Sequence, residues 1–209
     1  MIRVLIVDDS RQSRFYMQSI LAEHGDRFQA VAAIESAANA AMYCVRGLVD
    51  MILMDVCTAD NASGLAAAKK IKQSFPAVKI VMVTSMPEHS FLQQARDAGC
   101  DGFWYKEYGD VELDEVMTRV ADGGTVFPDR SPEVAVGFAR SGDFSEREFE
   151  IVRLLAAGLS RQEIADRLFI SPRTVRFYID EMKGKTGYDD TMKMVSDFIE
   201  NKLIINNIK

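Results

Sequence analysis

Three carboxylates, one hydroxyl and one amine each follow a short apolar stretch in the first half of the chain. They belong to Asp8, Asp9, Asp55, Thr84 and Lys106. Carboxylates gathered at one place repel one another, and a hard divalent cation such as Mg²⁺ is the usual relief. Asp55 would then attack a phosphoryl group, while Mg²⁺ and Lys106 neutralise the phosphoryl oxygens. These residue types predict phosphoryl transfer onto a carboxylate, with Thr84 donating a hydrogen bond to the acyl phosphate.

A second set of side chains, in the last third of the chain, has the chemistry of a DNA contact. The segment Ser160–Lys185 predicts two helices joined by a short turn, which is the spacing of a helix-turn-helix. Its second helix would present five side chains outward or toward DNA: Arg173, Thr174, Arg176, Phe177 and Lys183. The same pattern also fits an all-helical interaction module with a solvated charged face.

The acidic set needs a scaffold that brings its members together, and the first half of the chain predicts one. Short apolar runs predict five strands, at Arg3–Val7, Gln29–Ile34, Met51–Asp55, Lys79–Thr84 and Gly102–Tyr105. Helical periodicity predicts helices at Phe15–Leu21, Ala37–Val45, Leu65–Phe75, Phe91–Ala98 and Glu112–Ala121. Strict alternation of this kind indicates a parallel, doubly wound sheet, whose site lies outside the carboxyl ends of the strands.

The pattern changes at Gly123-Gly124, and from Ser145 onward only helices are predicted. Capping boxes at Ser145 and Ser160, and a proline after Ser171, place helices near 146–156, 161–168, 172–184 and 191–203. We therefore expect a first domain at 1–122, a linker at 123–143 and an all-α second domain at 144–209. The linker has room for a short amphipathic element around Val134–Phe138.

Composition limits the classes of partner and compartment. The net charge is −6, from 25 basic and 31 acidic residues, so a nucleic-acid partner must be recognised by a local surface. The sequence predicts no membrane-spanning stretch and no export signal. The three cysteines, Cys44, Cys57 and Cys100, form no metal-binding spacing, which favours buried thiols in a reducing cytoplasm.

The first half resembles the receiver domain of two-component response regulators, a flavodoxin-like fold. The matching stretches are VLIVDDS (4–10), MILMDV (51–56), IVMVTS (80–85) and GFWYKE (102–107). The resemblance implies that Asp55 is the phosphoacceptor of a sensor histidine kinase and that Asp8 and Asp9 hold Mg²⁺. It also implies that Thr84 and Lys106 contact the phosphate, with Thr84 turning toward it, and that Phe103 is an aromatic switch that turns inward.

The loop after the expected phosphoacceptor departs from the family pattern. Family members usually carry a proline at the fourth position after the aspartate and a glycine at the eighth, whereas this chain has Ala59 and, at the ninth, Gly64. The loop is thus one residue longer and lacks its rigid proline. The backbone carbonyl of Cys57, which the resemblance implies as a further Mg²⁺ ligand beside Asp8, Asp9 and Asp55, depends on this loop.

The second half resembles the LuxR-type DNA-binding domain of the NarL/FixJ subfamily of response regulators. The resemblance is carried by Ser145–Glu148, Leu155–Ser160, Glu163–Ala165, Ile170-Ser171, Thr174-Val175 and Lys185. It implies DNA contacts by Arg173, Thr174, Arg176 and Lys185. Tyr178, Thr186 and Thr191 depart from the usual histidine, leucine and arginine, and the acidic pair Asp189-Asp190 should weaken phosphate binding locally.

Together these patterns predict a cytoplasmic DNA-binding transcriptional response regulator, not an enzyme. Phosphorylation of Asp55 by a sensor histidine kinase, with Mg²⁺ as cofactor, would free the second domain and promote homodimerisation on DNA. One alternative is a regulator of the same build that acts without phosphorylation. A Mg²⁺-dependent phosphohydrolase is another, but it needs a general acid, and His24 and His89 lie on no motif. A non-DNA interaction protein is the third.

Overall fold

The structure is a computed structural model that describes residues 1–108 and 111–204. The chain forms two compact units, the first mainly from residues before Ser131 and the second mainly from residues after Arg130. Each unit is described by itself. Within the described residues, no helix is both long enough and apolar enough to cross a membrane.

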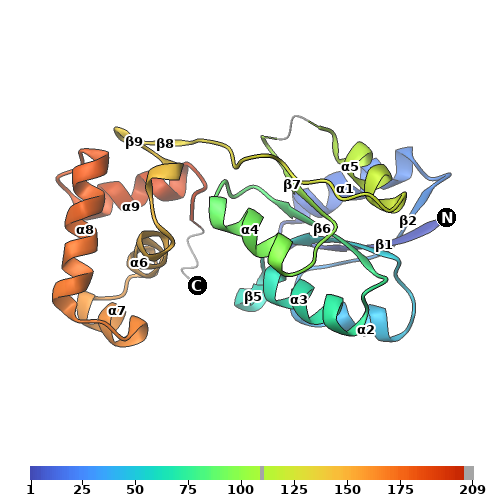
Figure 1. Cartoon of the computed structure of the whole chain (residues 1–209), viewed down its shortest axis with the longest axis horizontal. Helices are drawn as coiled ribbons and strands as arrows, with labels where there is room; N and C mark the ends of the chain where they lie inside the picture. The colour runs from blue at the N-terminus through green and yellow to red at the C-terminus, as the bar shows by residue number, and fades with distance from the viewer. Residues whose placement is uncertain (109–110, 205–209) are drawn as a thin grey trace. The chain divides into compact units, whose positions relative to one another are not determined.

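A five-stranded parallel sheet forms the centre of the first unit, in the order β2-β1-β3-β6-β7 (Figure 1). Its strands are β1(Ile2–Val7), β2(Phe28–Ile34), β3(Met51–Asp55), β6(Lys79–Thr84) and β7(Gly102–Tyr105). Every residue of β3 and β7 is buried. Strands covered on both faces need nearly continuous apolar sequence, which is why the prediction of a doubly wound sheet was possible. That prediction is confirmed.

Helices cover both faces of this sheet. On one face lie α1(Arg11–Glu23) and α5(Leu113–Ala121), whose apolar side chains share a core with β1, β3 and β6. On the other lie α2(Ala40–Val45), α3(Gly64–Ser74) and α4(His89–Asp97), as Figure 1 shows. The predicted second helix begins instead as a short 3₁₀ turn, η1(Ala37–Asn39).

The loop after β3 contains structure that the sequence pattern did not predict. Two short antiparallel strands, β4(Cys57–Thr58) and β5(Ala62–Ser63), are joined by the 3₁₀ turn η2(Ala59–Asn61). Asp60 lies in the left-handed region at φ 61°, a conformation that aspartate tolerates better than most residues. The additional residue of this loop is thus accommodated in a small hairpin. Two-residue strands are too short to produce a periodic signal.

As far as residue 204, the second unit contains four α-helices, α6(Glu146–Ala156), α7(Arg161–Leu168), α8(Pro172–Thr186) and α9(Thr191–Glu200). The capping boxes at Ser145 and Ser160 are formed as predicted. Helix α8 runs two residues beyond its predicted end, and α9 stops three residues before its own. The predicted domain ends at 209, and residues 205–209 lie outside the described residues.

Much of the predicted linker 123–143 is packed. Val126 lies beside β7, where it accepts a hydrogen bond from the backbone N–H of Phe103. The hairpin β8(Ala135–Val136) and β9(Ala139–Arg140), followed by η3(Ser141–Asp143), belongs to the second unit. Val136 is fully buried in that unit's core. The hairpin occupies the position where an amphipathic element was expected.

Candidate functional site

The carboxyl ends of four strands, β1, β3, β6 and β7, converge on one crevice of the first unit. Asp8 and Asp9 follow β1, Asp55 ends β3, and these three can each place a carboxylate oxygen within 4.8 Å of the others. Asp8 and Asp55 are buried, whereas Asp9 is exposed. Thr84 ends β6 and is buried, and Lys106 follows β7. The parallel topology thus brings together the acidic residues that the sequence placed after separate strands.

Lys106 connects the two buried acids. Its Nζ lies 2.6 Å from Asp8 Oδ2 and 2.8 Å from Asp55 Oδ2. Its backbone N–H donates to the carbonyl of Thr84 at 2.8 Å, which fixes the start of the Lys106 side chain to the end of β6. An ammonium held between two carboxylates is suited to neutralising the negative charge of a ligand that binds beside them.

Burial has a large effect on these groups. It is the main influence on Asp55 and raises the pKa of this carboxyl to about 6, although the charge of Lys106 lowers it. Burial likewise raises the pKa of Asp8. For Lys106 burial lowers the pKa, but the charges of Asp55 and Asp8 outweigh burial and raise it overall. One ammonium does not fully compensate two buried carboxylates, so a further cation would be stabilised here.

The donor set fits Mg²⁺. This ion prefers oxygen ligands and usually binds through one or two carboxylates, with water and phosphate completing its shell. Asp8, Asp9 and Asp55 offer carboxylate oxygens at suitable separation. Cys57, expected to contribute its backbone carbonyl, lies two residues after Asp55 in β4 and is half-buried.

Gly64 sets how closely α3 approaches the phosphoacceptor position. A Cβ on this residue would lie only 1.8 Å from the backbone carbonyl oxygen of Asp55. The N–H of Gly64 also donates to the carbonyl of Val56 at 2.8 Å. Only glycine, which has no Cβ, permits this approach. This explains why a glycine follows the loop here, as in the family pattern, although the loop is one residue longer.

Phe103, the expected switch residue, is already buried. Its side chain is 1% exposed, and its ring lies 4.9 Å from that of Tyr105 between centroids. An inward position is the one that the receiver resemblance associates with activation. In this structure the ring already occupies that inward position.

The second candidate surface lies on α8 of the helical unit. Ser171 caps this helix by accepting from the N–H of Thr174 at 3.0 Å, and Pro172 occupies its first turn. Ile164 and Val175 are fully buried between α7 and α8, which fixes the angle between the two helices. Sequence and structure agree here on a helix-turn-helix geometry.

Three of the predicted contact residues are exposed on α8: Arg173, Arg176 and Phe177. Arg176 also lies 3.5 Å from Asp180, one turn further along the helix. The hydroxyl of Thr174 is 2.8 Å from that of Ser171, so Thr174 contributes to the cap. Lys183 is half-buried. The exposed basic side chains therefore lie toward the N-terminal half of α8, the part of a recognition helix that usually meets base edges.

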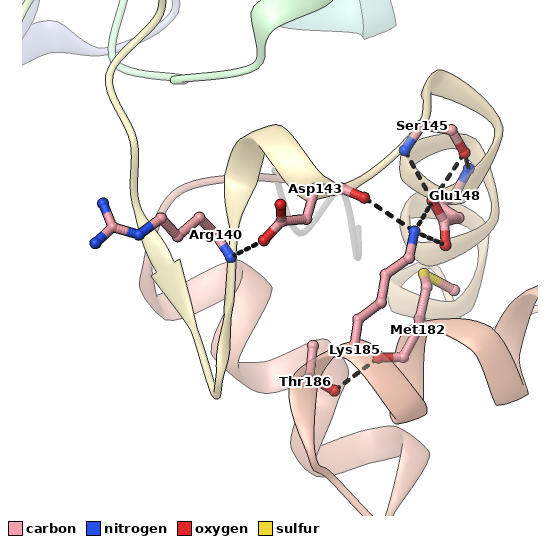
Figure 2. Close-up of polar contacts among 7 residues, drawn as sticks. All are labelled: Arg140, Asp143, Ser145, Glu148, Met182, Lys185 and Thr186. Atoms are coloured by element: carbon pink, nitrogen blue, oxygen red, sulfur yellow. Dashed lines mark hydrogen bonds and ion pairs between the residues drawn. The ribbon is translucent and has the colours of Figure 1, made fainter.

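Lys185 differs from the other predicted contacts because its ammonium is bound by three acceptors of the same unit (Figure 2). Its Nζ lies 2.7 and 2.8 Å from the two carboxylate oxygens of Glu148 and 2.9 Å from the carbonyl of Asp143. These contacts equal the three N–H donors of a lysine ammonium. Glu148 also accepts from the N–H of Ser145 at 2.8 Å, so Lys185 ties the end of α8 to the start of α6.

Comparisons with known proteins decide the family. The model described as "Response regulator receiver domain" matches residues 4–118. The model described as "Bacterial regulatory proteins, luxR family" matches residues 143–196. The response regulator protein VraR of Staphylococcus aureus is 30% identical over 211 residues, covering 97% of this chain and 99% of VraR. VraR of Staphylococcus epidermidis matches to the same extent.

The chain belongs to the response regulators. It combines a receiver domain with a LuxR-family domain, as both resemblances predicted, and this is a class of transcription regulator and not of enzyme. Solved structures share the fold. The RcsB response regulator of Salmonella typhimurium is 20% identical, with a TM-score of 0.56 over 94% of this chain and 98% of RcsB. An RcsB–DNA complex gives the same identity and TM-score over 94% and 97%.

Two residues beside the crevice of this response regulator escaped the sequence analysis. Arg14, on α1, donates to the backbone carbonyls of Asp8 and Asp9, and it pairs with Glu35 beyond the end of β2. Neither residue lies in a stretch that carries the family resemblance. The available signal was an arginine one turn into a helix that begins directly after the acidic pair.

Proposed function

We propose that this response regulator is phosphorylated on Asp55 by a sensor histidine kinase, and that phosphorylation promotes its dimerisation and its binding to DNA. The observation that carries the proposal is the position of Lys106. Its ammonium contacts the carboxylates of Asp8 and Asp55 together. A third carboxylate, that of Asp9, has an oxygen within 4.8 Å of theirs. This arrangement is suited to receiving a phosphoryl group.

In the proposed reaction, a carboxylate oxygen of Asp55 attacks the phosphorus of the donor phosphohistidine. An O–P bond to Asp55 forms as the P–N bond of the donor breaks. Mg²⁺ bound by Asp8, Asp9, Asp55 and the Cys57 carbonyl would supply positive charge to the phosphoryl oxygens. Lys106, after the carboxyl end of β7, would add a second positive charge, and the hydroxyl of Thr84 would donate to the acyl phosphate. Thr84 and Phe103 are the proposed switch pair.

For the output we propose DNA recognition by α8. Arg173 and Arg176 would contact phosphates or base edges, with Phe177 against a thymine methyl group, and Thr174 and Lys183 in supporting positions. Lys185 is the weakest member of the predicted set, because its ammonium already has three partners within the protein. Structurally similar RcsB has been solved as dimers bound to DNA, which supports a dimeric form here.

We propose that residues 1–122 form the receiver domain and residues 144–209 the DNA-binding domain. The family matches at 4–118 and 143–196 support these limits. Between them, 123–143 would connect phosphorylation to DNA binding, even though parts of this segment are packed against one unit or the other.

The decisive test is intact-mass measurement after incubation with acetyl phosphate and Mg²⁺, beside Asp55→Asn. We expect one added phosphoryl group on the wild type and none on the variant. Size-exclusion chromatography with light scattering should then show a larger dimer fraction for the phosphorylated protein, and a gel-shift titration should show tighter DNA binding. An adduct that survives Asp55→Asn, or one that changes neither property, would contradict the proposal.

A second candidate is a regulator of the same build that acts without phosphorylation. The observation in its favour is the longer loop after Asp55, which has Ala59 in place of a rigid proline and folds into the β4–β5 hairpin. This candidate predicts no adduct under conditions that preserve acyl phosphates, together with specific DNA binding that is the same for wild type and Asp55→Asn.

A further inference from the structure

Arg14 holds the backbone of both acids that follow β1. Its Nη1 donates to the carbonyl of Asp8 at 2.8 Å and to the carbonyl of Asp9 at 2.9 Å. The side chain is largely buried, with 14% of its surface exposed. Two hydrogen bonds from one charged nitrogen to consecutive carbonyls fix the path of the chain between β1 and α1. That path determines where the exposed carboxylate of Asp9 can point.

The other end of the same guanidinium reaches Glu35. Arg14 Nη2 lies 2.7 Å from Glu35 Oε1. The backbone carbonyl of Glu35 in turn accepts from the N–H of Ala59 at 2.9 Å, in the loop that follows Asp55. Glu35 is therefore in contact with both loops that border the crevice, through its side chain on one side and its backbone on the other.

Neighbouring contacts reinforce the attachment of the longer loop to the segment after β2. The N–H of Ala37 donates to Thr58 Oγ1 at 2.9 Å, and this hydroxyl donates to the carbonyl of Ala62 at 2.8 Å. Ser36 Oγ donates to the carbonyl of Ala59 at 3.3 Å. A loop without its usual proline is thus fixed by contacts to residues 35–37.

We propose that Arg14 and Glu35 are positioning residues for Mg²⁺: together they hold the Asp8-Asp9 loop and the loop carrying Cys57 at the separation that the ion requires. The inference rests on the proposed use of this crevice for Mg²⁺-dependent phosphorylation. Neither residue supplies a ligand atom. Residues that orient metal ligands typically change metal affinity by about 10- to 100-fold when they are replaced.

Charge alone makes the opposite prediction for Arg14. A positive group beside a cation site repels the cation, so its removal should strengthen Mg²⁺ binding. Positioning requires that its removal weaken binding. The sign of the change therefore separates the two roles. Arg11, an exposed arginine in the first turn of the same helix, provides the matched control for charge.

The experiment is a calorimetric titration of the full, unphosphorylated chain with Mg²⁺ at fixed ionic strength. We expect about tenfold weaker binding for Arg14→Gln and for Arg14→Lys, since lysine keeps the charge and loses the planar fork. Glu35→Gln should weaken binding less, because the backbone contact of Glu35 remains. Arg11→Gln should bind no more weakly than the wild type. Thermal unfolding in EDTA monitors the fold of each variant.

The double variant Arg14→Gln/Glu35→Gln should bind Mg²⁺ about as weakly as Arg14→Gln alone, since the two side chains act through one contact. Wild-type or tighter affinity in Arg14→Gln would overturn the positioning role and leave the proposed function intact. If Arg14→Gln does not fold, unchanged affinity in Glu35→Gln overturns it instead. A wild-type chain that binds no Mg²⁺ would overturn the receiver chemistry and this inference together.

Discussion

The receiver crevice and the outer face of α8 hold their functional side chains in different ways. In the crevice, Lys106 is paired with Asp8 and Asp55, and backbone contacts fix the surrounding loops. On α8, Arg173, Arg176 and Phe177 extend into solvent. The crevice is preorganised before any ligand arrives, whereas the α8 face has exposed pairs such as Arg176–Asp180 and would acquire its main partners on binding. Changes in the crevice should therefore affect stability and function together, and changes on the α8 face should affect function alone.

We expect the largest effect from replacing a glycine beside the crevice, which is compared with replacing a glycine on α8. A Cβ on Gly64 would overlap the carbonyl oxygen of Asp55 at 1.8 Å, so Gly64→Ala requires the backbone to move. We expect the free energy of unfolding of the receiver to fall by about 3 kcal/mol or more. The single tryptophan, Trp104, lies in β7 and reports on this unit during urea unfolding.

Gly184 is the matched control, on α8. A Cβ there meets no atom within 4 Å. Alanine is the better helix former, so Gly184→Ala should stabilise the helical unit by about 1 kcal/mol, measured by circular dichroism. Equal losses of stability from both substitutions would show that the two regions are not held differently.

The second test concerns Glu148, a carboxylate that is only 2% exposed. Burial raises its pKa, but hydrogen bonds from Lys185 and Ser145 outweigh burial and lower the pKa below its usual 4.5. A lowered folded-state pKa contributes stability above pH 4.5 that is lost as the pH falls through the lowered value. Glu148→Gln should lower the free energy of unfolding by about 2 kcal/mol at neutral pH. Thermal unfolding as a function of pH should show this difference shrink in acid.

The exposed neighbour Glu150 provides the control for Glu148. It pairs with Arg147 at 2.8 Å on the surface of α6. Surface pairs of this kind contribute little, so Glu150→Gln should change stability by less than about 0.5 kcal/mol at any pH. A loss at Glu150 as large as that at Glu148 would mean that burial of the Lys185 pair is not what stabilises the helical unit.

The sequence predicted the acidic residues and the lysine of the crevice better than it predicted the contacts and hairpins that surround them. Asp8, Asp55 and Lys106 end or follow parallel strands, and topology alone brings such ends to one edge. Arg14 meets Glu35 through side chains 21 positions apart, on elements whose spacing no local pattern records. The β4–β5 and β8–β9 hairpins escaped for a related reason, since their strands have two residues each and show no periodicity.

Lys185 shows the same limit in the helical unit. Its position in the sequence and its charge favoured a DNA contact, while its partner Glu148 lies 37 positions away. A signal was present: Glu148 is the acidic member of a capping box directly before an apolar run. A carboxylate buried at such a point needs a cation, and Lys185 supplies it.

The third test compares Arg176 with Lys185 in DNA binding. Arg176→Gln should weaken binding about tenfold and reduce the dependence of log affinity on log salt by about one counterion. Its melting temperature should stay at the wild-type value. Lys185→Met should lower the melting temperature and leave the salt dependence unchanged, because its ammonium is held by Glu148. Gel-shift titrations at several salt concentrations distinguish the two, and a reduced slope for Lys185→Met would restore it as a phosphate contact.

The smallest expected effect is at Asp180, which lies one turn after Arg176 on the exposed face of α8. Its carboxylate is 3.5 Å from Arg176 Nε, and both side chains are more than half exposed. Such a pair stabilises a helix only slightly, so Asp180→Asn should leave the melting temperature unchanged. The substitution releases Arg176 and removes a negative charge that would face the DNA phosphates. We expect about two- to threefold tighter binding at low salt, and a smaller gain as salt screens the charge.

Weaker binding would instead identify Asp180 as an acceptor for a base, most simply the N4 amino group of cytosine. The α8 face would then be organised by Asp180 as well as by its arginines, and the contrast with the crevice would be one of degree.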